Sequence, residues 1–396
     1  MKNSLRGYVC KWEKDLNIPL MEKSNDAPLI EYIMDAWKSL EVVQQIKVKK
    51  FEYTEEESEI DINKHIFKRE KKKKKKDRFD IKYTADDRVG KLTVHLEITM
   101  LEKNPETHET KYQVYPIKKS MLIPLQDENG FYVIHGKKYY LIYQVVEKST
   151  YTSNSSVTLK SLMPICVKRH AIEGEDMDGH IHTLPYYTVY VFRKEIPVLL
   201  FYLAHGINYA MSYLNVDNVI EFLDEMPSEK DPEYIYFGIS SKCFMKVDRD
   251  LFNEHQYIQS VVGGFLNICT TRMTIPGLDN TDEWIKKIAN PPSYDKGKSV
   301  LKYFNRLMDL TTQKILKVPD YYKDDIYAVL LWMMEHFNEL RLKDNCDLGN
   351  KRIRCNEYIA SLLSKEFSKR LNRIISMGDR ATIESMRELV SSSITT

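Results

Sequence analysis

The chain has 396 residues, of which 43% are hydrophobic and 11% aromatic, so it can bury a sizeable core and wholesale disorder is excluded. Its formal net charge is +2 and its pI is about 8.0, which excludes a bulk polycation and leaves any nucleic-acid binding to local basic patches. The six scattered cysteines form no Cys-x-x-Cys pair, so neither a disulfide framework nor a structural zinc site is expected.

The chain begins with a segment that lacks targeting features and continues into an amphipathic helix. Residues 1–20 have no continuous apolar core of signal-peptide length, and no run approaches the roughly 20 apolar residues of a membrane span. A soluble, intracellular protein of two or three domains is therefore expected. Residues 27–42 place Leu29, Ile33 and Trp37 at helical spacing, which predicts the helix.

The most charged segment follows, from Glu55 to Asp80, and it includes an unbroken lysine run from Lys71 to Lys76. Like charges in such a block repel one another, which favours a solvated loop. The same lysine run could instead contact a nucleic-acid backbone or serve as a nuclear-import signal, which are two more specific interpretations. The sequence leaves the three open.

Alternating hydrophobicity after Lys91 predicts a small antiparallel sheet. In KLTVHLEITML, every second residue from Leu92 to Met100 is apolar, as in a strand with one buried face. Two further extended runs, MLIPL and FYVIHGKKYYLIYQ, flank the turn sequence DENG.

The rest of the chain mixes strands and helices, and the expected fold class is α+β. Between Thr158 and Met245, strand-like runs flank the helical segment VLLFYLAHGINYAMSYL. The last third is mostly helical, with one apolar stripe at 326–340 and another at 358–374. Gly297-Lys298-Ser299 resembles the end of a phosphate-binding Walker A loop, but Pro292 stands where that loop needs its first glycine, so no nucleotide site is expected.

Three short segments carry more specific motifs. The first joins Ile123-Pro124-Leu125 to the run Asn129–Gly136 and to Gln144. The second is Arg193-Lys194-Glu195-Ile196-Pro197, which leads into VLLFYLAHGI. The third is DNCDLGNKRIR, residues 344–354, followed by a long helix. In this order they resemble the β-type (second-largest) subunit of multisubunit DNA-dependent RNA polymerases, in its "IPLMT..G.FIINGTERVIVSQ", "RRKIPVTLLLRALGY" and "D..DHLGNRRIR" elements.

The resemblance implies a protrusion-like domain, built from an antiparallel sheet and helices, with an inserted lobe-like α+β domain. It assigns residues 1–155 to the first part of the protrusion-like domain, 156–300 to the lobe-like domain, and 301–396 to a mostly helical return. Family members continue for several hundred residues more, and a divided β chain resembles the arrangement in giant bacteriophages. A non-catalytic N-terminal β-type fragment of a DNA-directed RNA polymerase, a nucleotidyltransferase, is therefore expected, acting in the cytoplasm of an infected bacterial cell.

The same resemblance implies the partners. They are the C-terminal half of the β-type subunit, one or more β′-type subunits, a possible promoter-specificity subunit, the DNA template and the RNA–DNA hybrid, with no membrane. Catalytic Mg²⁺ is expected on the β′-type partner, so no cofactor, metal site or catalytic residue is expected in this chain. A stand-alone nucleic-acid-binding protein using Lys71–Lys76 and a viral structural protein are the alternatives.

One segment, Asp176-Met177-Asp178-Gly179-His180, is close to the Asp-x-Asp-Gly-Asp loop with which RNA polymerases hold magnesium. His180 replaces the third carboxylate and is a poor magnesium ligand. Because Asp and Gly stand here between strand-like runs, a hairpin turn is predicted instead. His180 and His182 are expected to be a satisfied or exposed pair.

The candidate nucleic-acid contacts are Lys351, Arg352, Arg354 and Lys148. The first three place three cations within four positions at a predicted helix start, where they oppose the helix dipole. Pairing with Asp344, Asp347 or Glu357 would offset this charge, and contact with a phosphate or a base edge is the other interpretation. Lys148 matches the arginine of the polymerase family only if the alignment slips by one residue; otherwise Glu147 reverses the charge.

Overall fold

The computed structural model describes residues 22–23, 29–55, 89–103, 110–126, 131–134, 137–148, 150–153, 155–308, 310–316, 318, 322, 325–341, 346–348, 351–377 and 382–390. The chain forms two compact units. The first comprises Met1–Val146, Leu348–Ile374 and Arg380–Thr396, and the second comprises Glu147–Asp347 and Ile375–Asp379. The α+β class is confirmed. The correspondence of the units to a protrusion and a lobe stays a prediction, and the run Lys71–Lys76 lies outside the described residues.

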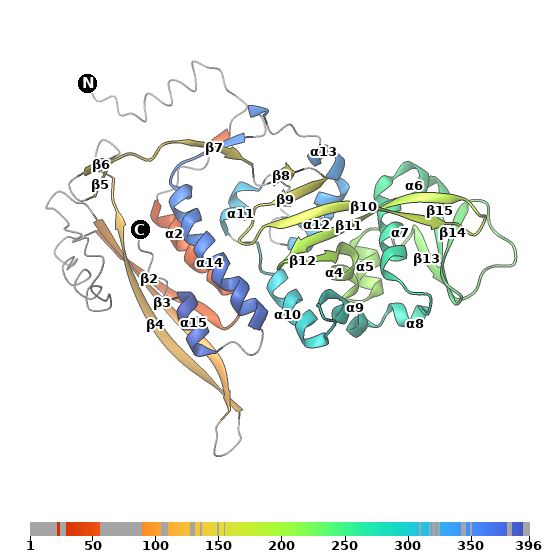
Figure 1. Ribbon diagram of the computed structural model, residues 1–396, viewed down its shortest axis with the longest axis horizontal. Helices are drawn as coiled ribbons and strands as arrows, with labels where there is room; N and C mark the ends of the chain where they lie inside the picture. Colours follow the sequence, from red (N-terminus) through yellow and green to blue (C-terminus); the bar gives the residue numbers. More distant parts are fainter. Residues whose placement is uncertain are drawn as a thin grey trace. The chain divides into compact units, whose positions relative to one another are not determined.

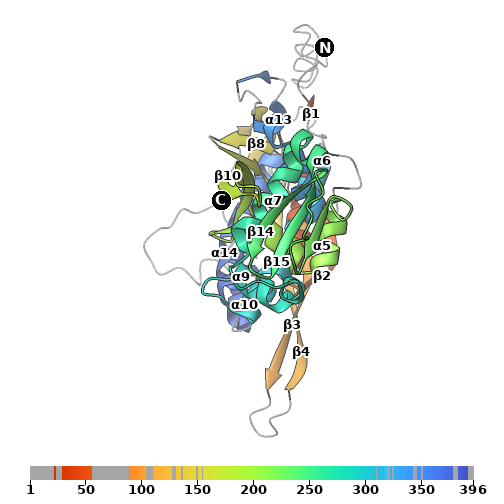
Figure 2. The same cartoon turned by 90° about the vertical axis from the view of Figure 1, so that its right-hand side faces the viewer.

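The first unit is built on a three-stranded antiparallel sheet in the order β2 (Ile46–Thr54), β3 (Val89–Lys103), β4 (Thr110–Pro124). The predicted alternation on the central strand is confirmed, because Leu92, Val94, Leu96 and Ile98 are all buried. Since β2 pairs with β3 only as far as Ile98, the ends of β3 and β4 extend beyond it as a two-stranded hairpin (Figures 1 and 2).

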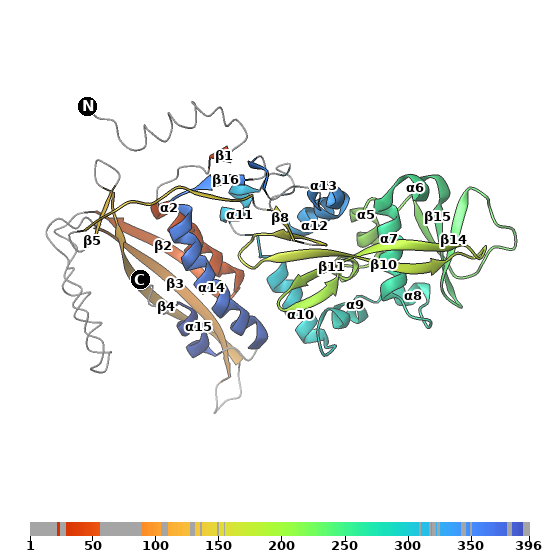
Figure 3. The ribbon, with the colours of Figure 1, turned by 45° about the horizontal axis from the view of Figure 1, so that its top comes forward.

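The helices of this unit lie on one side of that sheet (Figures 1 and 3). They are α2 (Leu29–Lys38), the short 3₁₀ turn η1 (Ser39–Val42), α14 (Glu357–Met377) and α15 (Ile383–Val390). The Trp37 indole joins them to the sheet, because its ring centroid is 5.1 Å from that of Phe367 on α14 and its Nε1 is 3.4 Å from Met121 Sδ on β4. The predicted helix at 27–42 is thus confirmed as α2 and η1. The face of the sheet that points away from these helices carries the polar residues that alternate with the buried apolar ones on β3.

Two small sheets complete the first unit. One has the order β1 (Glu22–Lys23), β16 (Lys351–Arg354), β7 (Gln144–Glu147), with β16 in the middle, and the other pairs β5 (Tyr132–Ile134) with β6 (Lys137–Tyr139). The central strand of the first sheet thus comes from the far end of the chain.

The second unit contains two antiparallel sheets. The larger has the order β12 (Lys194–Pro197), β11 (Ile181–Val191), β10 (Ile165–Glu175), β9 (Ser156–Leu159), β8 (Thr150–Ser153), and the smaller has the order β13 (Ile220–Leu223), β15 (Cys243–Asp248), β14 (Tyr234–Ser240). Its helices are α4 (Val198–Leu203), α5 (Ile207–Tyr213), α6 (Arg249–Glu254), α7 (Gln256–Ile268), α8 (Ile275–Leu278), α9 (Thr281–Ile288), α10 (Tyr294–Phe304), α11 (Leu310–Ile315), α12 (Ile326–Glu335) and α13 (Phe337–Arg341). The long β10–β11 hairpin runs beside α7 (Figure 3).

Close packing explains the Gly297-Lys298-Ser299 fragment. A Cβ atom on Gly297 would lie 1.9 Å from the carbonyl oxygen of Ile285, so only glycine lets α10 approach α9 this closely. The glycine therefore serves helix packing within the second unit.

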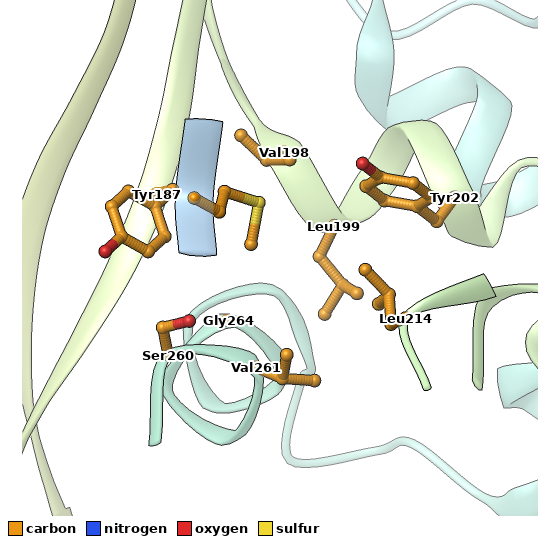
Figure 4. A pocket seen from close by; sticks show the side chains of 9 residues that line it. Tyr187, Val198, Leu199, Tyr202, Leu214, Ser260, Val261 and Gly264 are labelled. Atoms are coloured by element: carbon orange, nitrogen blue, oxygen red, sulfur yellow. The ribbon is translucent and has the colours of Figure 1, made fainter. Parts of the chain in front are cut away.

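A small cavity lies between β11, α4 and α7 (Figure 4). Its volume is about 10 Å³, close to the minimum for one water molecule. Two of its hydroxyl groups donate elsewhere, since the Ser260 hydroxyl donates to the carbonyl of Tyr257 and the Tyr202 hydroxyl donates to the carbonyl of Tyr327. The cavity is thus a packing defect of the core.

Among the helices that the structure describes, none has the length and apolar character needed to cross a membrane.

Candidate nucleic-acid interface

The cations Lys351, Arg352 and Arg354 lie on strand β16, and α14 begins only at Glu357. The predicted helix start at these cations is therefore wrong, and so is the expected opposition to the helix dipole. The segment is extended because β16 pairs with β1 in parallel and lies next to β7, so its backbone hydrogen bonds go to neighbouring strands. The first turn of α14 carries the Glu357 carboxylate, which the helix dipole favours.

Arg352 forms a buried, bidentate ion pair with Glu357. Arg352 Nη1 is 2.5 Å from Glu357 Oε2 and Nη2 is 2.6 Å from Oε1, and each side chain is 6% exposed. Glu357 is one of the three carboxylates considered from the sequence, and Asp344, another of them, lies outside the described residues. The pair links β16 to the helix that follows it, and thus orients α14 in the first unit.

Arg354 brings two of the family-like segments together. Its Nε donates to Gln144 Oε1 at 3.1 Å, and its guanidinium lies 5.0 Å from the centroid of the Tyr358 ring. The Tyr132 hydroxyl donates to Asn356 Oδ1 at 3.2 Å, which adds a second link between the same parts of the chain. The first and third segments, about 210 positions apart in sequence, therefore form one site in the first unit.

The remaining candidates lie at element ends. Lys351 is half-buried at the start of β16, and Lys148 is half-buried between β7 and β8, within the second unit. The charge of Glu147 is offset locally, because its Oε2 is 3.1 Å from Lys160 Nζ. Three candidates thus belong to one unit and Lys148 to the other, and nucleic-acid contact by any of them stays a prediction.

The second family-like segment forms a step from strand to helix, β12 followed by α4. Phe192 and Arg193 both have positive φ angles, 51° and 61°, in the two-residue turn that joins β11 to β12. Glu195 then accepts hydrogen bonds from Thr188, Lys168 and His170, which together lower the pKa of its carboxyl to about 2. This network binds β12 to β10 and β11.

Asp176 organises the tip of the β10–β11 hairpin, as the predicted turn requires. Its Oδ1 accepts from the backbone N–H groups of Asp178 and His180, both at 2.9 Å, and its Oδ2 is 2.9 Å from His182 Nε2 and 3.3 Å from His180 Nδ1. Asp178 pairs instead with Lys230, whose ammonium also reaches the Met177 carbonyl. Although these side chains are close enough to hold a cation, their oxygens are used to close the turn.

Replacing Asp176 with Asn is expected to destabilise the second unit by about 2 kcal/mol at pH 7. Burial raises the pKa of Asp176, but hydrogen bonds from His182 and from the backbone N–H groups of His180 and Asp178 outweigh it and lower the pKa to about 2. Because this pKa lies below its unfolded value, the stabilisation is present above about pH 4 and is lost as the pH falls towards 2. Denaturant unfolding of both proteins at pH 7 and pH 3 should show the difference between them roughly halved at pH 3.

Asp178→Asn is the matched control, since this carboxylate is more exposed, and its expected cost is below about 1 kcal/mol. A hairpin turn needs no cation, so Mg²⁺ should leave the stability of the unsubstituted protein unchanged. An Mg²⁺-dependent stabilisation that disappears in Asp176→Asn would contradict this account.

Further cations gather on the sheet face opposite the helices of the first unit, in segments without a family motif. Lys49 pairs with Glu97 at 2.7 Å, and Lys50 pairs with Glu52 at 3.1 Å. Glu52 Oε2 also lies 3.0 Å from His95 Nε2. The signal in the sequence was the alternating IKVKKFEYT of β2, whose lysines gather on one face only when the register with β3 is known.

The family model described as non-virion RNA polymerase subunit matches residues 9–396, a range that includes all three family-like segments and every described residue of both units. No curated protein matches the chain.

Proposed function

Because the chain belongs to the family of non-virion RNA polymerase subunits, we propose that it is a non-catalytic, N-terminal β-type part of a DNA-directed RNA polymerase. The observation that carries this proposal is the family match over residues 9–396, which coincides with three segments that resemble the β-type subunit in order. In this proposal the first unit is protrusion-like and the second is lobe-like.

The path of the chain supports the β-type assignment. The chain leaves the first unit after Val146 and returns to it at Leu348, as the resemblance implies for a protrusion with an inserted lobe. The Arg354–Gln144 hydrogen bond connects the returning chain to the first unit, and it joins residues from two of the family-like segments. A chance resemblance of separate fragments gives no reason for them to meet in one site.

Exposed apolar side chains of the first unit support a protein partner. Tyr112 and Ile142 are each 77% exposed, and Val145 is 54% exposed. Ile142 and Val145 lie three positions apart, just before and within β7, and neighbouring exposed apolar groups mark sites where proteins bind. We infer that the C-terminal part of the β-type subunit, as a separate chain, covers them, and that one or more β′-type subunits carry the catalytic Mg²⁺.

Within this assembly the chain would help to hold the DNA template and the RNA–DNA hybrid. Lys351, Arg354 and Lys148 are the proposed contacts from the family-like segments, whereas Arg352 is assigned to the internal ion pair with Glu357. A promoter-specificity subunit is a further proposed partner, and the proposed location is the cytoplasm of an infected bacterial cell.

Affinity purification of the tagged chain from its native source tests the proposal. We expect it to retain a chain with an intact Asp-x-Asp-Gly-Asp loop and to carry promoter-dependent RNA synthesis. Changing Tyr112, Ile142 and Val145 to Ser should reduce this co-purification, because these substitutions remove apolar contact area.

A control is Ile181→Ser, which alters an apolar side chain of the second unit that is 71% exposed and should leave co-purification unchanged. A stable monomer that retains no polymerase chain would contradict the proposal. The same outcome with DNA binding through Lys71–Lys76 would identify a stand-alone nucleic-acid-binding protein, and recovery in virus particles would identify a structural protein.

A further inference from the structure

The described helices of the first unit lie on one side of the sheet of β2, β3 and β4, and the other face points away from them (Figures 1 and 3). The register fixes its members, since Thr93 and Ser120 meet through their hydroxyl oxygens at 3.0 Å on this face. His95 lies opposite Lys50 on one side and Lys118 on the other. The helices contact the reverse face, as the contact of Trp37 with Met121 shows. This surface is called the open face below.

The open face is strongly basic. Its described charged side chains comprise five lysines and two glutamates, which leaves three positive charges in excess: Lys47, Lys49, Lys50, Lys91 and Lys118 against Glu52 and Glu97. Lys47, Lys49, Lys50 and Lys118 are all exposed.

Both glutamates are already neutralised by neighbouring cations. Glu52 lies 3.1 Å from Lys50 Nζ, 3.0 Å from His95 Nε2 and 3.6 Å from Lys118 Nζ, and hydrogen bonds from His95 and Lys50 lower the pKa of its carboxyl to about 2. Glu97 is 2.7 Å from Lys49 Nζ. The two carboxylates therefore order the lysine side chains around them. Because the lysines outnumber the glutamates, the face keeps a net positive charge.

The dimensions of the basic area match a nucleic-acid backbone. From Lys91 to Glu97 the central strand rises roughly 20 Å, and three strands are roughly 10 Å across. Along 20 Å of its axis, duplex DNA presents about six phosphates on each strand. Four exposed lysines on such a surface can therefore reach several phosphates at the same time.

The basic area of the open face presents lysine side chains but, among its described residues, no aromatic rings on which nucleic-acid bases could stack. Single strands are held mainly by stacking of bases on aromatic rings. The aromatic residues of β2, Phe51 and Tyr53, face the other way, opposite Val94 and Leu92, and Tyr112 lies at the distal end of the hairpin. Lysine ammonium groups without aromatic neighbours favour phosphate contacts, which carry no sequence information.

We propose that the open face binds the phosphate backbone of duplex DNA without sequence preference, with Lys47, Lys50 and Lys118 as its principal contacts. The inference rests on the proposed function, since a polymerase subunit of this kind meets duplex DNA. It adds a surface that is separate from Lys351, Arg354 and Lys148. Charge complementarity is the argument for the occupant, because an excess of lysine on a rigid sheet favours a polyanion.

The test measures binding of the full chain to a fluorescein-labelled duplex by fluorescence anisotropy over a range of salt concentrations. The variant Lys47→Gln/Lys50→Gln/Lys118→Gln is expected to bind at least about tenfold more weakly at 0.1 M salt, and its salt slope should fall by about 2 to 3. The matched control Lys242→Gln/Lys296→Gln/Lys298→Gln removes the same charge from exposed lysines of the second unit and should bind as the unsubstituted chain does.

Both triple variants are also measured with Lys71–Lys76 changed to Gln, so that this run cannot mask the open face. Unchanged binding by the open-face variant in that background would overturn the inference. So would an unsubstituted chain that does not bind duplex DNA, or one that prefers an unstructured single strand of the same length. None of these results affects the co-purification test of the proposed function. A failure of the open-face inference can therefore be told apart from a failure of the proposed function.

Discussion

Replacing Arg352 with Met is expected to lower the free energy of unfolding of the first unit by about 3–5 kcal/mol. The substitution removes the guanidinium but leaves the Glu357 carboxylate buried, with 6% of its side chain exposed and both of its oxygens without their partner. Hydrogen exchange measured by mass spectrometry reports the effect locally, because peptides from α14 should lose protection while those from α7 keep it.

The double variant Arg352→Met/Glu357→Met is the decisive control. It removes both charges, so it should be more stable than Arg352→Met alone, by an amount that measures the cost of the unpaired carboxylate. The neighbouring cation Lys351, changed to Met, should cost less than about 1 kcal/mol, since this side chain is only half-buried. If the α14 peptides of Arg352→Met kept the hydrogen-exchange protection of the unsubstituted protein, the Arg352–Glu357 pair would not be what holds α14 in place.

The adjacent glycines of α7 are expected to respond in opposite directions to alanine. A Cβ on Gly263 would lie 2.3 Å from the carbonyl oxygen of Pro185, so Gly263→Ala must push α7 away from β11, at a cost of about 2–3 kcal/mol. A Cβ on Gly264 would meet only Leu199, at 3.4 Å, beside the small cavity. Gly264→Ala should therefore stabilise the second unit by about 1 kcal/mol, because alanine favours the helix.

Thermal and denaturant unfolding of the two alanine variants provides the measurement. Both change one hydrogen to one methyl group in the same helix, so each is the composition-matched control of the other. Equal effects of the same sign would contradict the close approach of α7 to Pro185 and would mean that the helix packs against the sheet with more freedom than this geometry allows.

Local patterns predicted the parts of the fold that local physics determines. The alternation from Leu92 to Ile98 gave the central strand of the first sheet, because one buried face is enough to specify period two. The Asp176 turn was predicted because aspartate and glycine between extended runs favour a tight connection. The helix after Pro197 was predicted from its own apolar pattern, whereas the strand before it was implied only by the family resemblance.

The parts that failed or were missed depend on partners distant in sequence. β16 is four residues long, and its conformation is set by β1 and β7, so the basic run before a helical pattern was assigned to the helix. The open face was missed because Lys50 and Lys118 become neighbours only through the registers of two strand pairs with His95. A single lysine in a strand pattern carries no information about such a surface.

The placement of β16 between β1 and β7 also has a consequence for synthesis on the ribosome. The strands on either side of it end by Glu147, but β16 itself is not made until residues 351–354. At typical translation rates, the roughly 200 intervening residues take about 10–40 s to emerge. The second unit therefore has time to fold first, while the early strands of the first unit wait with an open position that a foreign strand can occupy. Co-expression with chaperones, or with the partner chain proposed above, should accordingly raise the yield of correctly folded chain.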